Sequence, residues 1–293
     1  MGGVTVADDL DSALEVFEGV RPRLFGIAYR MLGSATEAED LVQDVWLRWQ
    51  AADRSTVTNP AAYLATATTR LAINAAQSAR VRRETYVGPW LPEPVNTSAD
   101  PYLGAERADA LEFAVLLLLE RLSPNERAAY VLREAFDYPY PQIAEILQLN
   151  EPAVRQLVSR ARKHVTGERR TPVDSAEQRK LLSAFVTAAR SGDLAELEEL
   201  FAPDVTSVSD GGGIRSASKI PVHGAQTVAK YFRSFKDRFW VGVEVELSTV
   251  NGQPAALLRQ DGKILAVLTL VATSEGIEQL MWVMNPAKLG RVG

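Results

Sequence analysis

The chain has 293 residues, of which 46% are hydrophobic and 24% are charged, with a formal net charge of −5 and no cysteine. This length allows two or three domains, each with its own core. The negative charge argues against a protein that coats nucleic acid through bulk charge. The lack of cysteine excludes disulfides, thiolate nucleophiles and cysteine-based zinc sites. Without a secretion signal or an apolar run of about 18 residues, we expect a cytoplasmic protein that does not engage membranes.

Three helices are predicted in residues 8–84, which form the first predicted domain. Each shows apolar residues at helical spacing, and the three cover residues 21–32, 35–50 and 59–83. Thr36, followed three residues later by Glu39, has the spacing of a capping box at the start of the second helix.

Two polar patterns stand out on these helices. Asp40, Asp44 and Arg48 recur every four residues, which an ordinary solvated face would also explain. Arginines occupy three of the four positions from 80 to 83, at the end of the third helix. Cations stabilise the end of any helix, but three so close together also form a patch for nucleic-acid phosphates.

Residues 85–104 are predicted to form an extended linker, because prolines and glycines interrupt every regular pattern in them. Tyr86, Trp90 and Leu91 are unusually apolar for such a segment. We expect a linker that carries a tryptophan to dock on another part of the protein.

Residues 122–165, within a second predicted domain over residues 105–168, have the pattern of a helix-turn-helix. Pro141 suits the first turn of one helix, and Asn150 is the expected N-cap of the next. The apolar face of that second helix consists of Val154, Leu157, Val158, Ala161 and Val165. Its outer face suits phosphate contacts and base reading, and it carries Arg155, Gln156, Ser159, Arg160, Arg162 and Lys163. The alternative is an ordinary helical hairpin with a solvated basic face.

Charge is unevenly distributed along the helical part of the chain. Residues 1–170 contain 19 Lys and Arg against 23 Asp and Glu, whereas residues 155–170 contain six cations and one anion. Basic surfaces are thus confined to two helix ends within an acidic region. This distribution favours two partners, a nucleic acid at the basic patches and a protein at the acidic ones.

A third domain is predicted over residues 173–293, where helical patterns precede strand-rich sequence. The helices are expected at 176–191, 193–200 and 225–235, and the strands at 205–209, 240–250, 254–260, 263–272 and 275–284. Asn251-Gly252 and Asp261-Gly262 are hairpin signals. The order indicates an α+β domain with a curved antiparallel sheet that can enclose a pocket. The whole chain is therefore predicted to be multidomain, with two all-α domains before this α+β domain.

Asp210 and His223 are the residues of the third domain that could move protons. His223 is its only histidine, and we expect Asp210 to be exposed beside a turn of three glycines. The alternative is that Asp210 shapes this turn and that His223 caps the following helix. An active site also needs several polar groups converging on one pocket, whereas the strands are expected to point mainly Val, Leu and Ala inward. We therefore favour a domain that is not an enzyme and has no cofactor or metal.

The chain resembles bacterial RNA polymerase sigma factors of the extracytoplasmic-function (ECF) group, followed by a SnoaL-like domain of the NTF2-like fold. Residues 21–49 resemble sigma regions 2.1–2.2, residues 59–83 regions 2.3–2.4, and residues 122–165 region 4. The segments YVGPWLPEPV, DGGG and NPAKL resemble the subgroup of ECF factors with this fused C-terminal domain.

The resemblance implies three binding surfaces on the helical domains, whose partners would be core RNA polymerase, through its β′ clamp and β flap, and promoter DNA. Core polymerase would contact Asp40, Gln43, Asp44 and Trp46. The −10 element and the melted strand would contact Tyr63, Arg70, Asn74, Arg80, Arg82 and Arg83. The −35 element would contact the outer face of the recognition helix.

For the C-terminal domain, the resemblance implies regulation in place of a separate anti-sigma factor. We expect contacts between the linker and the two C-terminal motifs to hold the sigma domains in a set relative position. These contacts would involve Trp90, Leu91, Pro92, Asp210, Gly211, Gly212, Gly213, Asn285, Pro286, Lys288 and Leu289. A small apolar ligand in the pocket could bias this switch.

Two other functions are consistent with parts of the sequence. In the first, the C-terminal domain is a working cyclase or isomerase, and the helical domains are its targeting module; Asp210 and His223 would then line a cavity. In the second, the helix-turn-helix acts alone as a conventional repressor. That alternative leaves the acidic stripe and the arginines at 80–83 unexplained.

Overall fold

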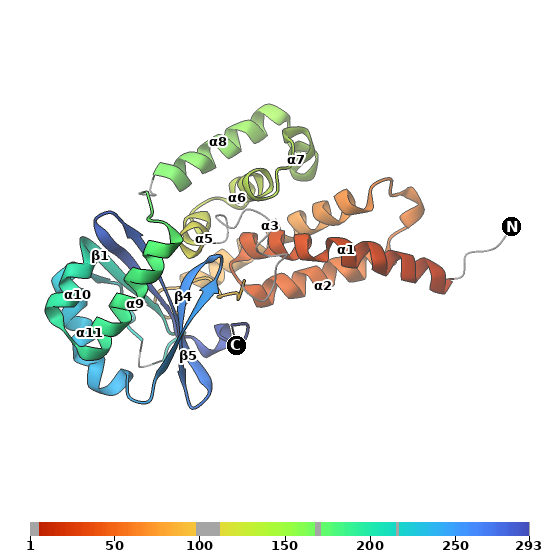
Figure 1. Cartoon of the computed structure of the whole chain (residues 1–293). Helices are drawn as coiled ribbons and strands as arrows, with labels where there is room; N and C mark the ends of the chain where they lie inside the picture. Colours follow the sequence, from red (N-terminus) through yellow and green to blue (C-terminus); the bar gives the residue numbers. More distant parts are fainter. Residues whose placement is uncertain (1–5, 98–111, 168–170, 215–216, 293) are drawn as a thin grey trace. The chain divides into compact units, whose positions relative to one another are not determined.

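The computed structural model describes residues 6–97, 112–167, 171–214 and 217–292 of the chain (Figure 1). The described residues divide into two compact units. The first comprises residues up to 82 together with 118–165, and the second comprises residues 83–97, 112–117 and those from 166 onward. None of the helices described here is both long and apolar enough to span a membrane.

The first unit begins with α1 (Val6–Leu32), α2 (Ala35–Ala51), the 3-10 turn η1 (Arg54–Thr56) and α3 (Pro60–Glu84). The first helix starts well before the predicted position 21 and contains Pro22. The predicted cap at Thr36 is wrong: Ser34 is the N-cap of α2, and its hydroxyl accepts a 3.2 Å hydrogen bond from the Glu37 amide. A serine one residue before the helix satisfies an amide that would otherwise lack a partner.

The remaining helices of the helical part are α5 (Phe113–Glu120), α6 (Pro124–Tyr130), the π-helical turn η3 (Val131–Ala135), α7 (Tyr140–Leu147) and α8 (Glu151–Gly167). Helices α7 and α8 form the helix-turn-helix. The predicted helix start at residue 105 lies outside the described residues. Gln148 ends α7 in the left-handed conformation, with φ 55°. Asn150 then caps α8, accepting a 2.9 Å hydrogen bond from the Ala153 amide. The tight turn predicted between the two helices is confirmed.

Two arginines, the buried Arg127 and the exposed Arg70, join helices of the first unit. Arg127, which is 4% exposed, donates a 2.6 Å hydrogen bond to the Met31 carbonyl at the end of α1. Arg70 of α3 donates to the Ile146 carbonyl of α7 at 2.9 Å. Both arginines thus satisfy carbonyls at helix ends, which have no partner within their own helix.

The second unit is an α+β domain. Its elements are α9 (Ser175–Ser191), α10 (Leu194–Leu200), β1 (Phe201–Asp210), β2 (Val222–His223), α11 (Ala225–Phe239), β3 (Glu244–Val250), β4 (Gln253–Gln260), β5 (Lys263–Thr273), β6 (Gly276–Val283) and the 3-10 turn η4 (Pro286–Lys288). The strand order is β2-β1-β6-β5-β4-β3. Strands β3 to β6 form the predicted antiparallel meander, joined by turns in which Asn251, Gly252, Asp261 and Gly262 all have positive φ. Strand β1 pairs in parallel with β6, so the sheet is mixed.

Each face of this sheet has its own apolar core. Residues of α9, α10 and α11 pack with one face, which those helices cover (Figure 1). On the other face Leu91 of the linker, Phe113 of α5 and the C-terminal Leu289 and Val292 join sheet residues in a second buried cluster. The linker is therefore part of the core of this unit, because Leu91 is only 1% exposed.

Candidate functional site

The recognition helix α8 presents all six residues predicted for the −35 element on its exposed face. Three of its arginines are held by carboxylates: Arg155 pairs with Glu151, Arg160 with Glu126 at 2.8 Å, and Arg162 with Glu134 at 2.7 Å. The hydrogen bond from Arg160 is the main cause that lowers the pKa of Glu126. Exposed pairs of this kind contribute little to stability, so another anion can compete for these guanidinium groups.

The residues predicted for core polymerase lie on α2. Asp40, Gln43 and Asp44 are exposed on one face of the helix. Trp46 is half-buried, and its ring lies 4.9 Å from that of Phe17 in α1. The acidic stripe is therefore a solvent-facing surface, and Trp46 lies beside it with its ring against α1.

The residues predicted for the −10 element lie along α3, in different environments. Asn74 and Arg80 are exposed, and Tyr63 is 40% exposed with its ring 5.6 Å from Trp49. Arg82 forms a 2.5 Å ion pair with Glu37. As described above, Arg70 binds the end of α7.

Arg83 belongs to the second unit, where its guanidinium lies 3.6 Å from the centre of the Trp90 ring. The Lys288 ammonium lies 4.4 Å from the centre of the same ring. Two cations thus contact one half-buried tryptophan of the linker, an arrangement favoured by the negative potential of the indole face.

Asp210, the last residue of β1, binds the linker directly. Its carboxylate accepts hydrogen bonds from the Tyr86 hydroxyl at 2.5 Å, the Leu91 amide at 2.8 Å and the Lys288 ammonium at 2.7 Å. The prediction that Asp210 is exposed is wrong, since its exposed fraction is 0%. Asp210 lies at the end of a strand, where its carboxylate would be exposed to water. The docked linker and the C-terminal turn cover it.

The groups around Asp210 have shifted pKa values. Burial lowers the pKa of Lys288, and the charge and hydrogen bond of Asp210 oppose that shift. Burial and then the hydrogen bond to Asp210 raise the pKa of Tyr86 well above its usual value. The Lys288 ammonium also donates to the Leu91 carbonyl at 2.6 Å, so both backbone polar groups of Leu91 are satisfied.

The glycine turn after Asp210 is shaped by close approach. Gly212 has φ +57°, and a Cβ built on it would lie 2.5 Å from the Asn285 amide nitrogen. The Gly212 amide donates to Asp210 at 3.2 Å, and Asn285 donates to the Tyr86 hydroxyl at 2.8 Å. The glycine is required here both for its backbone conformation and for the space that Asn285 occupies.

The other predicted regulatory residues surround this network. Gly211, Pro92, Leu91 and Leu289 are buried, Gly213 is exposed with φ +94°, and Pro286 is exposed in η4. Asn251 is a further contact of the linker that is not among the predicted residues: its side chain accepts a 2.9 Å hydrogen bond from the Val95 amide. Its hairpin signal identifies a turn but contains no indication that the linker would dock on it.

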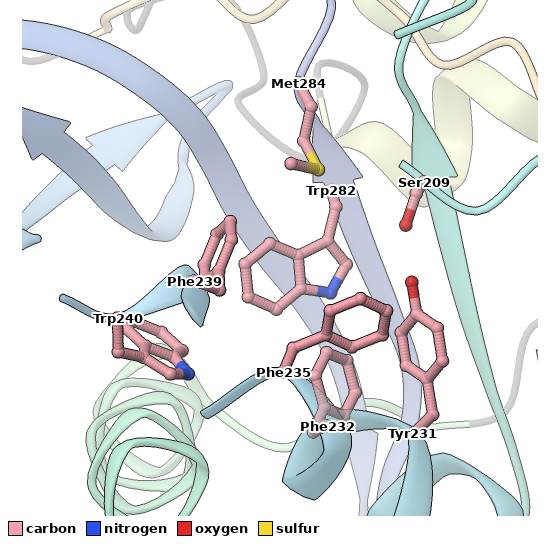
Figure 2. A pocket seen from close by; sticks show the side chains of 8 residues that line it. All are labelled: Ser209, Tyr231, Phe232, Phe235, Phe239, Trp240, Trp282 and Met284. Carbon is pink, nitrogen blue, oxygen red and sulfur yellow. The ribbon is translucent and has the colours of Figure 1, made fainter. Parts of the chain in front are cut away.

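The helices and sheet of the second unit enclose a separate pocket, lined by Ser209, Tyr231, Phe232, Phe235, Phe239, Trp240, Trp282 and Met284 (Figure 2). Neither Asp210 nor His223 lines it. His223 is exposed and its ring hydrogen-bonds the Thr206 hydroxyl at 3.1 Å. The prediction that His223 caps a helix is wrong, because Gly224 is the N-cap of α11 and makes no side-chain hydrogen bond. The arrangement that would have favoured an enzyme is thus not found among the described residues.

Known proteins match both units. The family model described as Sigma-70 region 2 matches residues 16–82, and that described as Sigma-70, region 4 matches residues 112–165. The ECF RNA polymerase sigma factor SigJ of Mycobacterium tuberculosis is 35% identical, with 93% of this chain and 91% of SigJ covered. The probable ECF RNA polymerase sigma factor SigI of the same species is 31% identical, with 92% of each chain covered.

Similarity extends to the three-dimensional structure. The crystal structure of SigJ from Mycobacterium tuberculosis matches with a TM-score of 0.75 and 32% identity, covering 94% of this chain and 97% of that chain. The match includes the helical sigma domains and the α+β domain that follows them. The chain therefore belongs to the ECF family of RNA polymerase sigma factors and carries an additional C-terminal α+β domain.

Proposed function

We propose that the C-terminal domain sets the activity of this sigma factor by binding the linker between sigma regions 2 and 4. As an ECF sigma factor the chain acts in transcription initiation, and no separate anti-sigma factor would be needed to control it. The observation that carries the proposal is the buried carboxylate of Asp210, which binds Tyr86 and Leu91 of the linker and Lys288 of the C-terminal turn.

Regulation would act on DNA binding through Arg83. This arginine is one of the predicted −10 contacts, and it lies on the same tryptophan ring as Lys288. While the linker is docked, Arg83 belongs to the C-terminal unit rather than to the rest of α3. Release of Trp90 would free the Arg83 guanidinium for phosphate or base contacts.

The remaining surfaces would serve the general steps of initiation in the cytoplasm. Core polymerase would bind the exposed acidic face of α2 through its β′ clamp, with the β flap as its second contact. The −35 element would bind the outer face of α8, and the −10 element the exposed residues of α3. Under this proposal the C-terminal domain is not a catalyst, and a ligand in its pocket would act by shifting the linker equilibrium.

The test is promoter-specific transcription with purified core polymerase and the full chain. Trp90→Ala removes the ring shared by the two cations, and Gly212→Ala forces Asn285 away from Tyr86. Both are expected to change transcript yield severalfold. Losing contacts worth about 1–3 kcal/mol changes the ratio of two states by about fivefold or more. Gly262→Ala is the matched control, since Gly262 also has a positive φ, +75°, and a Cβ built on it would meet nothing within 4 Å.

Unchanged yield from both variants would reject regulation through the linker. Deletion of residues 171–293 tests the broader proposal. Failure of both the full and the shortened chain to support initiation from an ECF-type promoter would contradict a role in initiation, independently of the regulatory mechanism.

A further inference from the structure

The pocket of the C-terminal domain lies between α11 and the strands β1 and β6, on the face of the sheet away from the linker. The empty space at this site, counted together with the open solvent at its mouth, is about 380 Å³. Six of its eight lining residues are aromatic, and none of the eight carries a formal charge. Such a lining suits a small, mainly apolar molecule.

The aromatic rings form a cage around Trp282 of β6. The centres of the Phe232, Phe239 and Trp240 rings lie 5.5, 5.9 and 6.5 Å from that of Trp282. Phe239 and Trp240 are oriented edge-on to it, whereas Phe232 is tilted by 33°. Rings at such distances and angles accept another planar ring in edge-to-face or offset contact.

One polar group of the cage lacks a partner. Trp282 is 3% exposed, and its indole nitrogen has no hydrogen-bond partner among the residues that the structure describes. Figure 2 shows this nitrogen on the edge of the indole that faces the side chains of α11. The Tyr231 hydroxyl, by contrast, is hydrogen-bonded with Ser209. Because a buried N–H without an acceptor is unfavourable, a ligand with an acceptor atom would satisfy the Trp282 indole.

The lining also distinguishes between classes of ligand. A cage of aromatic faces could hold a quaternary ammonium group, but an inward N–H donor would repel it and no carboxylate of the lining would balance its charge. A carboxylate ligand would find no cation among the same eight residues. A neutral molecule with an acceptor oxygen meets neither obstacle.

We propose that this pocket binds a small neutral aromatic molecule with one hydrogen-bond-accepting oxygen. Its ring lies among Phe232, Phe239 and Trp240, and its oxygen accepts a hydrogen bond from the Trp282 indole N–H. Aryl ketones, aryl aldehydes and phenols have this combination. Binding itself does not depend on regulation through the linker, so the two proposals can fail separately.

Binding is tested with the full chain by isothermal titration, with saturation-transfer NMR to follow the probe. Acetophenone is the probe with a ring and an acceptor oxygen, ethylbenzene has the ring alone, and benzyltrimethylammonium replaces the oxygen with a cation. Acetophenone is expected to bind about tenfold more tightly than ethylbenzene, the worth of one buried hydrogen bond. The ammonium probe is expected not to bind.

Trp282→Phe removes the N–H and keeps an aromatic ring. It is expected to lower the affinity for acetophenone about tenfold and to leave the affinity for ethylbenzene unchanged. Trp46→Phe, on α2, removes an indole N–H outside the pocket and is the matched control. Phe235→Trp places a larger ring in the pocket and is expected to weaken the binding of both neutral probes. This variant provides the test if Trp282→Phe does not fold.

Three outcomes would overturn the proposal. The first is an absence of saturable acetophenone binding at millimolar concentration. The second is equal binding of acetophenone to the unmodified chain and to Trp282→Phe or Phe235→Trp. The third is a preference for ethylbenzene or benzyltrimethylammonium over acetophenone.

Discussion

At the scale of single residues, Asp210 connects three distant segments of the chain. A fully buried carboxylate requires partners, because desolvation of an unpaired charge costs several kcal/mol. Asp210 obtains them from a phenol, a backbone amide and an ammonium group. The partner ammonium of Lys288 is itself only 11% exposed, so either charge would be left uncompensated without the other.

Asp210→Asn is expected to destabilise the second unit by about 3 kcal/mol, since removing one partner of a buried ion pair leaves the other charge unbalanced. Urea unfolding followed by tryptophan fluorescence measures the change in unfolding free energy. Asp261→Asn is the matched control: Asp261 is exposed in a hairpin turn with φ 50°, a conformation that asparagine also adopts. Equal effects of the two substitutions would contradict the assigned role of Asp210.

The raised pKa of Tyr86 predicts a pH dependence. Above about pH 10 the unfolded chain loses the tyrosine proton while the folded chain retains it, so the stabilisation from Tyr86 is complete below that pH and decreases above it. The stability difference between the unmodified chain and Tyr86→Phe should therefore shrink between pH 9 and pH 11. We expect a change of less than about 1 kcal/mol, because the ring is only half-buried and solvent screens it.

The same urea titrations at several pH values measure this effect. Lys288 is present in both proteins, so its own lowered pKa, which raises stability with increasing pH, largely cancels in the difference. A difference that grows with pH would contradict the assignment of the proton to Tyr86.

At the scale of secondary-structure elements, the arginines of α8, which we propose to contact the −35 element, are all held by carboxylates. Its arginines are folded onto carboxylates of α6, η3 and α8 itself. These exposed pairs orient the guanidinium groups at little energetic gain. Under the proposed role, DNA binding would exchange each carboxylate for a phosphate or a base edge.

Glu126→Gln is expected to increase the affinity of the holoenzyme for its promoter two- to fivefold. The substitution removes the ion pair with Arg160, whereas glutamine can still complete the capping box with Ser123 at the start of α6. Promoter binding by core polymerase with the full chain, measured by fluorescence anisotropy, checks this. Glu177→Gln on α9, which removes an exposed pair with Lys180, is the control. A decrease in affinity would show that the Glu126–Arg160 pair positions the helix instead of restraining the arginine.

At the scale of the whole molecule, the boundary between the two compact units does not coincide with the ends of secondary-structure elements. It falls within α3, between residues 82 and 83, within α5, between residues 117 and 118, and within α8, between residues 165 and 166. Both sigma regions thus share a helix with the C-terminal unit. The net charge of −5 also opposes DNA binding by the chain alone, because the basic surfaces belong to a molecule whose overall charge has the same sign as that of DNA.

We therefore expect the full chain to bind promoter DNA at least 100-fold more weakly alone than together with core polymerase at about 0.15 M salt. Two short basic surfaces release few counterions, and core polymerase would be required to hold them at the spacing of the promoter elements. Anisotropy titrations of one labelled promoter, with and without core polymerase, measure the ratio. Comparable affinities would instead favour a DNA-binding protein that acts alone.

Much of the local structure follows from the sequence by itself. Pro141 and Asn150 define the two helices of the helix-turn-helix, and Asn-Gly and Asp-Gly pairs define two hairpins of the sheet. Each of these signals acts through groups a few residues apart, as caps, turns and apolar periodicity do. The family resemblance and the linker docking expected from Trp90 rest on the same kind of local pattern.

Only the tertiary structure decided the environment of the individual functional groups. Asp210 looked like an exposed acid, yet its partner Tyr86 lies 124 residues away in the chain. Arg70 is predicted to contact DNA, and the structure adds a hydrogen bond to a carbonyl of α7 that lies 76 residues further on. The physical reason is that burial and pairing of a charge depend on which distant surfaces the fold brings together. A local sequence pattern shows that a side chain is charged but not which groups will surround it.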